Sequence, residues 1–141
     1  MGLVETIIKK VLEKGIILSK TKISDSVYKI RIQSDGIADY DFVPGHFLRL
    51  GVGIDQDEIS LKDKVRSYSV WDINKENSTI DIAIATHSNG IGAKWVETCN
   101  PNDTVYFKWK KGKFLADDSA DSYLMIGELS ALSHLYIIGR W

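Results

Sequence analysis

Four consecutive residues, Arg66-Ser67-Tyr68-Ser69, combine side chains that suit a nucleotide cofactor. They lie in a stretch with the two-residue alternation of a strand, which places Arg66 and Tyr68 on the same face. A guanidinium is a planar fork of donors that fits a phosphate, and a tyrosine ring offers a flat stacking surface. This face therefore suits a flavin dinucleotide, in which a ring system and a pyrophosphate are covalently linked. The alternative is an exposed arginine beside a packed tyrosine on an ordinary strand.

A second segment, residues 87–95 (HSNGIGAKW), predicts a turn that leads into a helix. Its two glycines let the backbone approach a ligand closely, and Asn89 is a candidate cap for the helix. The N-terminus of such a helix attracts anions. The segment is not a Rossmann fingerprint, because Trp95 stands where the third glycine belongs, and its spacing to Lys94 does not fit a P-loop. A turn that uses glycine for geometry alone is the alternative.

Three shorter segments contain turn residues next to chemically useful side chains. They are Pro44-Gly45-His46-Phe47, Lys111-Gly112-Lys113-Phe114 and the run from Gly127 to Leu132. Each of them, taken alone, is more typical of a plain turn than of a site.

The elements that must position these residues are mostly short strands. An amphipathic helix over Leu3–Glu13, with Gly15 as its stop, precedes them. Alternating apolar residues and turn signals then predict six strands, with one brief helix over Ile91–Thr98 between the fifth and the sixth. The strands are expected at residues 16–22, 27–32, 47–52, 65–73, 79–86 and 104–109. This pattern favours an antiparallel barrel or sandwich.

The C-terminal part of the sequence has a different pattern. Tyr123–Ile126 is a continuous apolar run, which predicts a strand buried on both faces, and Ser130 is a candidate cap for a helix through Ile138. A full βαβ unit needs roughly 30 residues or more, so only its beginning fits before residue 141. We therefore predict an N-terminal helix (1–14), a barrel (15–118) and the incomplete start of an α/β domain (119–141). The unpaired apolar run also predicts self-association through this tail.

Composition and charge exclude several classes of protein. Eighteen basic and nineteen acidic residues give a net charge of −1, which provides no general attraction to nucleic acid or an anionic membrane. The lysines at 108, 110, 111 and 113 are expected to protect a strand edge. Cys99 is the only cysteine and the three histidines are widely spaced, so we expect no metal site, and no stretch is long enough to span a membrane. A cytoplasmic protein is the default expectation.

The order of these motifs along the chain resembles the ferredoxin-reductase superfamily. Within it, the chain is most similar to the siderophore-interacting flavoproteins, which are ferric-siderophore reductases. The resemblance covers residues from about Gly15 to Ile138. It implies a mainly β fold, a six-stranded antiparallel Greek-key barrel that binds FAD, followed by a strand–helix stub of an NAD(P)-binding α/β domain.

The resemblance also implies roles for individual residues. Arg66 would bind the FAD pyrophosphate, Tyr68 would stack on the isoalloxazine, and Ser69 would hydrogen-bond near its reactive N5 edge, so Tyr68 and Ser69 are the catalytic candidates. The loop from Gly127 to Leu132 would face the nicotinamide. The full set of expected cofactor-binding residues is Arg66, Ser67, Tyr68, Ser69, His87, Gly90, Gly92, Ala93 and Trp95. Among these, the amides of Gly90, Gly92 and Ala93 would contact the pyrophosphate, and Trp95 would pack behind them.

The chemistry implied by the resemblance is hydride transfer from NAD(P)H to FAD, then one-electron reduction of Fe(III). The iron would be substrate, held by a siderophore. Three positions depart from the usual pattern: Ala93 stands where relatives often have serine, and Leu129 and Ser133 replace an acidic residue and a proline. The alternative function is an FAD-binding or interaction module without reductase turnover.

Overall fold

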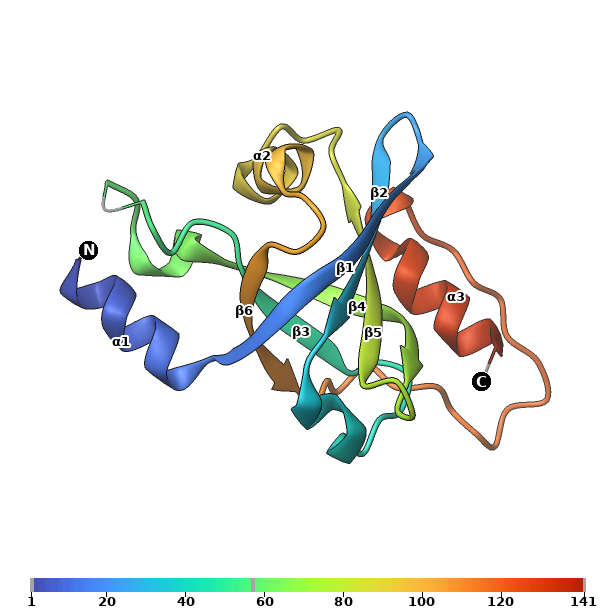
Figure 1. The fold of residues 1–141 in the computed structure, drawn as a ribbon. Helices are drawn as coiled ribbons and strands as arrows, with labels where there is room; N and C mark the ends of the chain where they lie inside the picture. The colour runs from blue at the N-terminus through green and yellow to red at the C-terminus, as the bar shows by residue number, and fades with distance from the viewer. Residues whose placement is uncertain (1, 57, 141) are drawn as a thin grey trace.

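In the computed structural model, which describes residues 2–56 and 58–140, six strands form a closed barrel (Figure 1). Their order around the barrel is β1-β2-β5-β4-β3-β6, and every neighbouring pair is antiparallel. The strands are β1 (Glu13–Ser24), β2 (Val27–Gln33), β3 (Phe47–Gly51), β4 (Val65–Asn74), β5 (Thr79–Ala85) and β6 (Thr104–Lys110). The prediction of a mainly β, six-stranded antiparallel barrel is confirmed.

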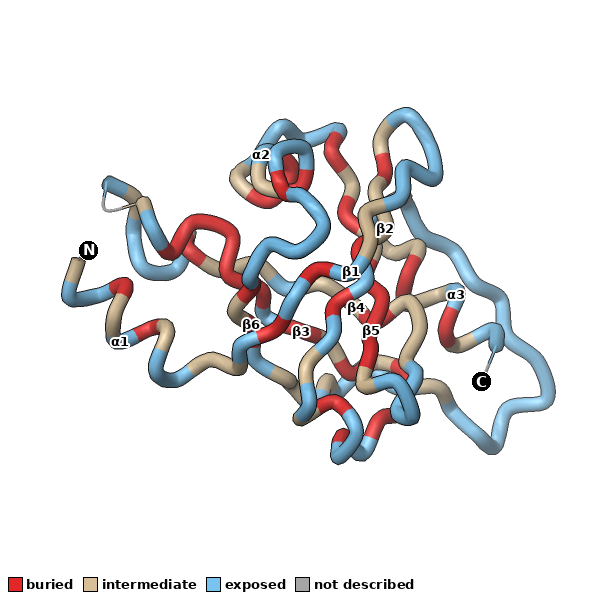
Figure 2. Tube along the Cα trace, viewed as in Figure 1, coloured by how far each residue is buried: buried red, intermediate tan, exposed pale blue. Residues whose placement is uncertain are grey.

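The barrel interior is filled by branched aliphatic side chains at alternate strand positions. Ile30 of β2 pairs with Ile82 of β5, and Ile32 pairs with Ile80, and all four side chains have no exposed surface. Each such isoleucine stabilises the fold by about 1.5–3 kcal/mol. Figure 2 shows the resulting concentration of buried residues along the strands. The alternation visible in the sequence therefore determines which face of each strand points inward.

The barrel opens along one seam, between β4 and β5. These strands pair only from Val70 to Asn74, and Trp71 is an extra residue between the pairs Val70–Ile82 and Asp72–Asp81. The first part of β4 pairs with β3 alone, and Ala83–Ala85 pair with β2 alone. A bulge of this kind bends a strand away from its partner. Strands β4 and β5 therefore separate toward the end of β5, which leads into the helix at Ile91–Thr98.

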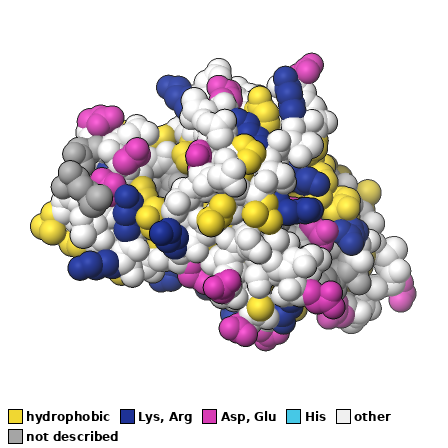
Figure 3. All heavy atoms as spheres, in the orientation of Figure 1, with side chains coloured by type: hydrophobic (Ala, Val, Ile, Leu, Met, Phe, Trp, Pro, Cys, Tyr) yellow, Lys and Arg dark blue, Asp and Glu magenta, His cyan; other side chains and the backbone are white. Residues whose placement is uncertain are grey.

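Three α-helices accompany the barrel in the described residues: α1 (Leu3–Val11), α2 (Ile91–Thr98) and α3 (Leu132–Arg140). Short 3₁₀ helices lie at Asp35–Asp39, Leu61–Lys64 and Leu129–Ala131. Helix α2 has the predicted bounds and connects β5 to β6. Helix α1 projects from the barrel and exposes apolar side chains, visible at the left of Figure 3, where acidic and basic side chains are interspersed over the rest of the face.

The N-terminal helix is shorter than predicted. It ends at Val11, and Glu13 already begins β1. Gly15 is therefore not a helix stop but a buried strand residue paired with Val105. A Cβ atom there would lie 2.9 Å from the carbonyl oxygen of Gln33 and 3.0 Å from the ring of Phe107. Glycine is needed at this position because the strands and the core pack closely around it.

The prediction of a buried strand at Tyr123–Ile126 is wrong. The segment is irregular, with Leu124 88% and Ile126 84% exposed, and Figure 2 shows this stretch as an exposed trace. A strand buried on both faces needs neighbouring strands, and in the described residues none pairs with this segment. The following helix begins at Leu132, after a 3₁₀ turn, rather than at Ser130, whose hydroxyl donates to Glu128 at 2.6 Å.

The lysine-rich strand is also not an edge. Strand β6 pairs with β1 on one side and with β3 on the other, so its lysines protect no open strand. Closure of the barrel, which the sequence alone does not show, removes the edge. Over residues 2–56 and 58–140, no helix combines the length and hydrophobicity that crossing a bilayer requires.

Candidate functional site

The open seam between β4 and β5 forms a groove of about 360 Å³. All the predicted cofactor-binding residues except Trp95 line it. The walls come from four parts of the chain: Arg66–Ser69 of β4, Ala83 and Ala85 of β5, residues 87, 88 and 90–93 at the start of α2, and Glu128, Ser130 and Ser133 near the start of α3. The fold therefore brings together the two motifs that the sequence placed about twenty residues apart. The lining by Ala83 and Ala85 was missed, because small residues on a strand carry no chemical signal.

The side chains of Arg66 and Tyr68 lie on the same face of β4, as predicted, and both face the first turn of α2. A Cβ atom on Gly92 would lie 2.0 Å from the Tyr68 hydroxyl oxygen and 3.7 Å from Cγ of Arg66. Glycine at position 92 is thus what allows the helix backbone to approach the tyrosine. Burial raises the pKa of Tyr68 to about 12, so its ring stays a neutral phenol at physiological pH.

The Arg66 guanidinium is held only by local contacts. Its Nη1 donates to the Val65 carbonyl oxygen at 3.0 Å, and its Nη2 lies 3.4 Å from the Asp63 carboxylate. The hydrogen bond from Ser60 and the charge of Arg66 lower the pKa of Asp63. Since the Arg66 side chain is 41% exposed and its ion pair is long, the guanidinium is free to turn toward an anion in the groove.

The N-terminus of α2 opens onto this groove. Its cap residue is Gly90, and no side chain caps the helix. The prediction that Asn89 caps it is wrong. Asn89 has a φ of 53°, and the Gly90 amide donates a hydrogen bond to the Ser88 hydroxyl at 3.3 Å. The first amides of a helix have no partner within it, so they are available to an anion. His87 lies exposed at the mouth of the groove.

A second hollow of about 300 Å³ continues the groove and shares Ser67 and Ser69 with it. The two weaker turn motifs contact each other here: a Cβ atom on Gly112 would lie 2.0 Å from the carbonyl oxygen of Gly45. Gly45 has a φ of 108°, a backbone conformation that favours glycine. The turns at 44–47 and 111–114 therefore build one wall of the hollow together.

The same hollow contains a residue that the sequence analysis missed. His134 of α3 lines it, and its ring meets Phe114 edge-on at 5.3 Å between centroids. Among the described residues, its buried Nε2 atom has no hydrogen-bond partner. An unpaired buried polar atom costs about 1–3 kcal/mol, which a bound polar group would recover. No spacing in the sequence links His134 to Ser69, so only the packing of α3 reveals it.

Trp95 does not reach the groove. It packs against the barrel core and lines a smaller hollow with Val105 and Tyr106 on another side of α2. The core takes the large apolar ring of Trp95, whereas Gly92, which has no side chain, lies against Tyr68.

The largest groove, about 550 Å³, lies near the β4–β5 turn and has a different character. Its lining includes the carboxylates of Asp35, Asp72, Glu76 and Asp81, with neither an aromatic ring nor a glycine. This surface offers a pyrophosphate no helix N-terminus, and its one lining arginine, Arg31, is already bound to Asp81. Within the described residues, no group of three or more histidine, cysteine, aspartate or glutamate side chains is arranged to hold a metal ion.

An aromatic and cationic strand face opposite a glycine-rich helix start has the chemistry that suits a nucleotide cofactor. The family described as the oxidoreductase FAD-binding domain matches residues 14–115. The chain belongs to this family. Among curated proteins, none matches it.

Solved structures share the fold. A siderophore-interacting protein from Acinetobacter baumannii has a TM-score of 0.77 and 19% identity, covering 92% of this chain and 53% of its own. The siderophore-interacting protein SipS from Aeromonas hydrophila has a TM-score of 0.73 and 20% identity, with coverages of 92% and 53%. Ferredoxin-NADP+ reductase from Plasmodium falciparum, in a structure with 2'P-AMP, has a TM-score of 0.69 and 19% identity, with coverages of 91% and 51%. The chain thus spans about half the length of these proteins.

The residues of the groove fit FAD. Gly92 lets the first turn of α2 lie against Tyr68, Arg66 is available to a phosphate, and the buried Nε2 atom of His134 lacks a partner among the described residues. The groove and the hollow beside it lie in the size range of cofactor pockets. Their shared residues, Ser67 and Ser69, make them one continuous path that suits an extended dinucleotide.

Proposed function

We propose that this chain holds the FAD of a reductase that passes electrons from NAD(P)H to the Fe(III) of a siderophore. The observation that carries the proposal is the convergence of Arg66, Tyr68 and Gly92 in the open seam. When bound, FAD supplies the chemistry of such a reductase, because a flavin accepts a hydride and releases single electrons. The protein contributes binding, orientation and the exclusion of water.

At the α2 end of the groove, the proposed ligand is the pyrophosphate. Arg66 would exchange its long contact with Asp63 for a charge-assisted hydrogen bond to a phosphate oxygen. The amides of Gly92 and Ala93 would donate from the first turn of α2, and Gly90 and His87 would border the phosphates. Ala93 offers its amide only, since it lacks the hydroxyl of a serine.

Next to the pyrophosphate, along β4 from Tyr68 to Ser69, the proposed ligand is the isoalloxazine ring. Tyr68 would provide the stacking surface, and its raised pKa keeps the phenol neutral. Ser69 would hydrogen-bond to the reactive edge of the ring, with Ser67 beside it where the two hollows join. Tyr68 and Ser69 are therefore the residues to which we assign contact with the reacting part of the cofactor.

The assignment of a siderophore as substrate rests on resemblance and on the names of two structural neighbours. The lysine-rich end of β6 offers support, because Lys113 lines the hollow next to Ser69 and Lys111 is exposed beside it. These cations would favour the approach of a negatively charged chelate. The nicotinamide cofactor is proposed from the ferredoxin-NADP+ reductase neighbour.

The first experiment is a visible absorption spectrum of the purified chain after addition of FAD and gel filtration. We expect flavin bands to stay with the protein. Replacing Arg66 with alanine should weaken the binding of FAD more than that of riboflavin, which has no pyrophosphate, whereas the exposed Arg49→Ala control should change neither. An equal loss for both ligands would refute the assignment of Arg66 to the pyrophosphate.

A second readout separates a reductase from a module that only holds FAD. Flavin retained by the chain should bleach on anaerobic addition of NADH or NADPH and recover its colour on addition of a ferric siderophore. If FAD is retained but neither nicotinamide bleaches it, the chain binds FAD without turnover by itself.

A further inference from the structure

Helix α3 lies along the seam of the barrel, beside the groove. Its buried residues, Ser133 and Ile137, face the sheet, and Figure 1 shows the helix alongside β4 and β5. Tyr136 and Arg140 lie on the same side, because residues three, four and seven positions apart share one face of a helix. Each of Ser133, Tyr136 and Arg140 contacts a strand at the point where β4 and β5 separate.

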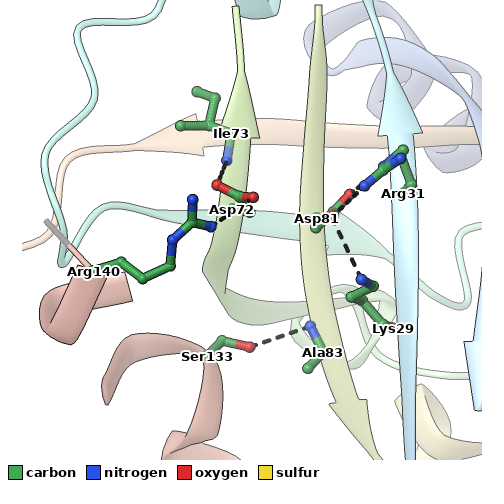
Figure 4. Close-up of polar contacts among 8 residues, drawn as sticks. All are labelled: Lys29, Arg31, Asp72, Ile73, Asp81, Ala83, Ser133 and Arg140. Atoms are coloured by element: carbon green, nitrogen blue, oxygen red, sulfur yellow. Dashed lines mark hydrogen bonds and ion pairs between the residues drawn. The ribbon is translucent and has the colours of Figure 1, made fainter. Parts of the chain in front are cut away.

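The Ser133 hydroxyl replaces a missing strand contact. The Ala83 amide of β5 lies beyond the last pair with β4, and it donates to Oγ of Ser133 at 3.2 Å (Figure 4). A backbone amide facing a parted strand would otherwise lack a partner, at a cost of about 1–3 kcal/mol if buried. Helix α3 therefore supplies a hydrogen-bond acceptor to the edge of β5 that the bulge leaves unpaired.

Tyr136 packs on the bulge itself. Its ring stacks on Trp71, with centroids 4.4 Å apart and planes inclined by 22°. Trp71 is the extra residue of β4, and only the pair Val70–Ile82 follows it before β4 and β5 separate. The stacked pair thus holds α3 at the residue where the seam begins.

Arg140 neutralises one of two carboxylates that face each other across the strands. Asp72 of β4 lies opposite Asp81 of β5, and like charges in this position destabilise a sheet. Asp81 is bound by Arg31 through two contacts, at 2.8 and 3.0 Å, and Asp72 by Nη1 of Arg140 at 2.8 Å (Figure 4). Each carboxylate therefore has its own arginine, one from β2 and the other from α3.

We propose that the docking of α3 on β4 and β5 and the binding of FAD in the groove stabilise each other, and that Ser133, Tyr136 and Arg140 are the positioning residues of the helix. Glu128, Ser130 and Ser133 line the groove, and His134 lines the hollow next to Ser69, so docking of α3 completes the site. A ligand that contacts the docked helix must stabilise the docking, because coupling between two equilibria is reciprocal. This inference rests on the proposed placement of FAD in the groove.

The experiment combines hydrogen exchange with FAD titration on the full chain. We expect FAD to slow amide exchange in residues 132–140 of the wild type. The double variant Tyr136→Ala/Arg140→Gln should bind FAD about tenfold more weakly, because it loses a stacked pair and an ion pair. Tyr136→Phe/Arg140→Lys keeps a ring and a charge and should restore affinity to within about twofold. The control is Tyr123→Ala/Arg49→Gln, which removes a tyrosine and an exposed arginine outside the seam and should bind FAD normally.

The possible results lead to different conclusions. FAD binding to the wild type with unchanged exchange in α3 overturns the coupling but leaves the proposed function intact. Equal FAD affinity of the wild type and the Tyr136→Ala/Arg140→Gln variant also overturns the coupling and leaves the proposed function intact. If that variant does not fold, the exchange of wild-type α3 with and without FAD decides the question. Failure of the wild type to retain FAD overturns the proposed function and the coupling together.

Discussion

Replacing Gly92 with alanine tests the close approach of α2 to β4. The new methyl carbon would lie 2.0 Å from the hydroxyl oxygen of Tyr68 and 3.3 Å from its Cζ atom. Either the tyrosine ring must tilt or the first turn of α2 must withdraw. Overpacking costs about 1–3 kcal/mol, and alanine regains up to about 1 kcal/mol in a helix. We therefore expect a loss of stability of only about 0–2 kcal/mol.

The loss of FAD affinity should be larger than this change in stability suggests. Moving the ring or the amides disturbs either the stacking surface or a hydrogen bond to a charged phosphate. One such hydrogen bond contributes about 1.5–3 kcal/mol, so we expect Kd for FAD to rise about ten- to hundredfold. Fluorescence titration with FAD measures this rise, and urea unfolding measures the stability.

Two further variants test whether the collision with Tyr68 causes the loss of FAD affinity. Gly139→Ala is the matched control, because it also adds a methyl group to a helical glycine, meets no atom within 4 Å and should leave FAD affinity nearly unchanged. Tyr68→Phe removes the oxygen that collides, so the double variant Gly92→Ala/Tyr68→Phe should bind FAD more tightly than Gly92→Ala alone. If the two changes simply add, the collision with Tyr68 is not the cause of the loss.

Three other changes have directions fixed by the structure. Gly139→Ala should stabilise the chain by up to about 1 kcal/mol, because no atom lies within 4 Å of the added Cβ; a lower midpoint of urea unfolding would contradict this. Gly112→Ala should destabilise it by about 1–3 kcal/mol or more, since the new carbon would meet the Gly45 carbonyl oxygen at 2.0 Å; thermal unfolding checks it. Burial, together with Lys111, lowers the pKa of His46 below its ordinary 6.5. The unfolded chain therefore binds this proton more readily, and stability should fall as pH drops through about 6.5, with a smaller fall in His46→Gln.

Much of the barrel was predictable because its strands carry strong local signals. The alternation of Ile80, Ile82 and Ile84 needs no knowledge of neighbours, since burial of one face follows from the period of two. The placement of Arg66 and Tyr68 on one face of a strand was likewise predictable from their spacing. Helix α2 matched its predicted bounds for a similar reason: glycine before it and a polar stretch after it mark both ends.

Features that depend on distant partners were predicted less well. Tyr123–Ile126 has the composition of a buried strand, but composition supplies no neighbouring strand, and the segment stays exposed. The lysines of β6 suggested an edge, because closure of a barrel is a property of all its strands. The predicted cap at Asn89 is wrong, because Asn89 has a left-handed backbone conformation and Gly90 is the cap residue of α2.

The sequence by itself determined the inward face of each strand and the residue types that suit a flavin dinucleotide, because both depend on local spacing. The tertiary structure decided where those residues meet. The bulge at Trp71 opens the seam, Gly92 admits the backbone of α2 to Tyr68, and α3 brings His134 beside Ser69. Each of these depends on contacts between residues far apart in the chain, which are formed by packing and not encoded by any one segment.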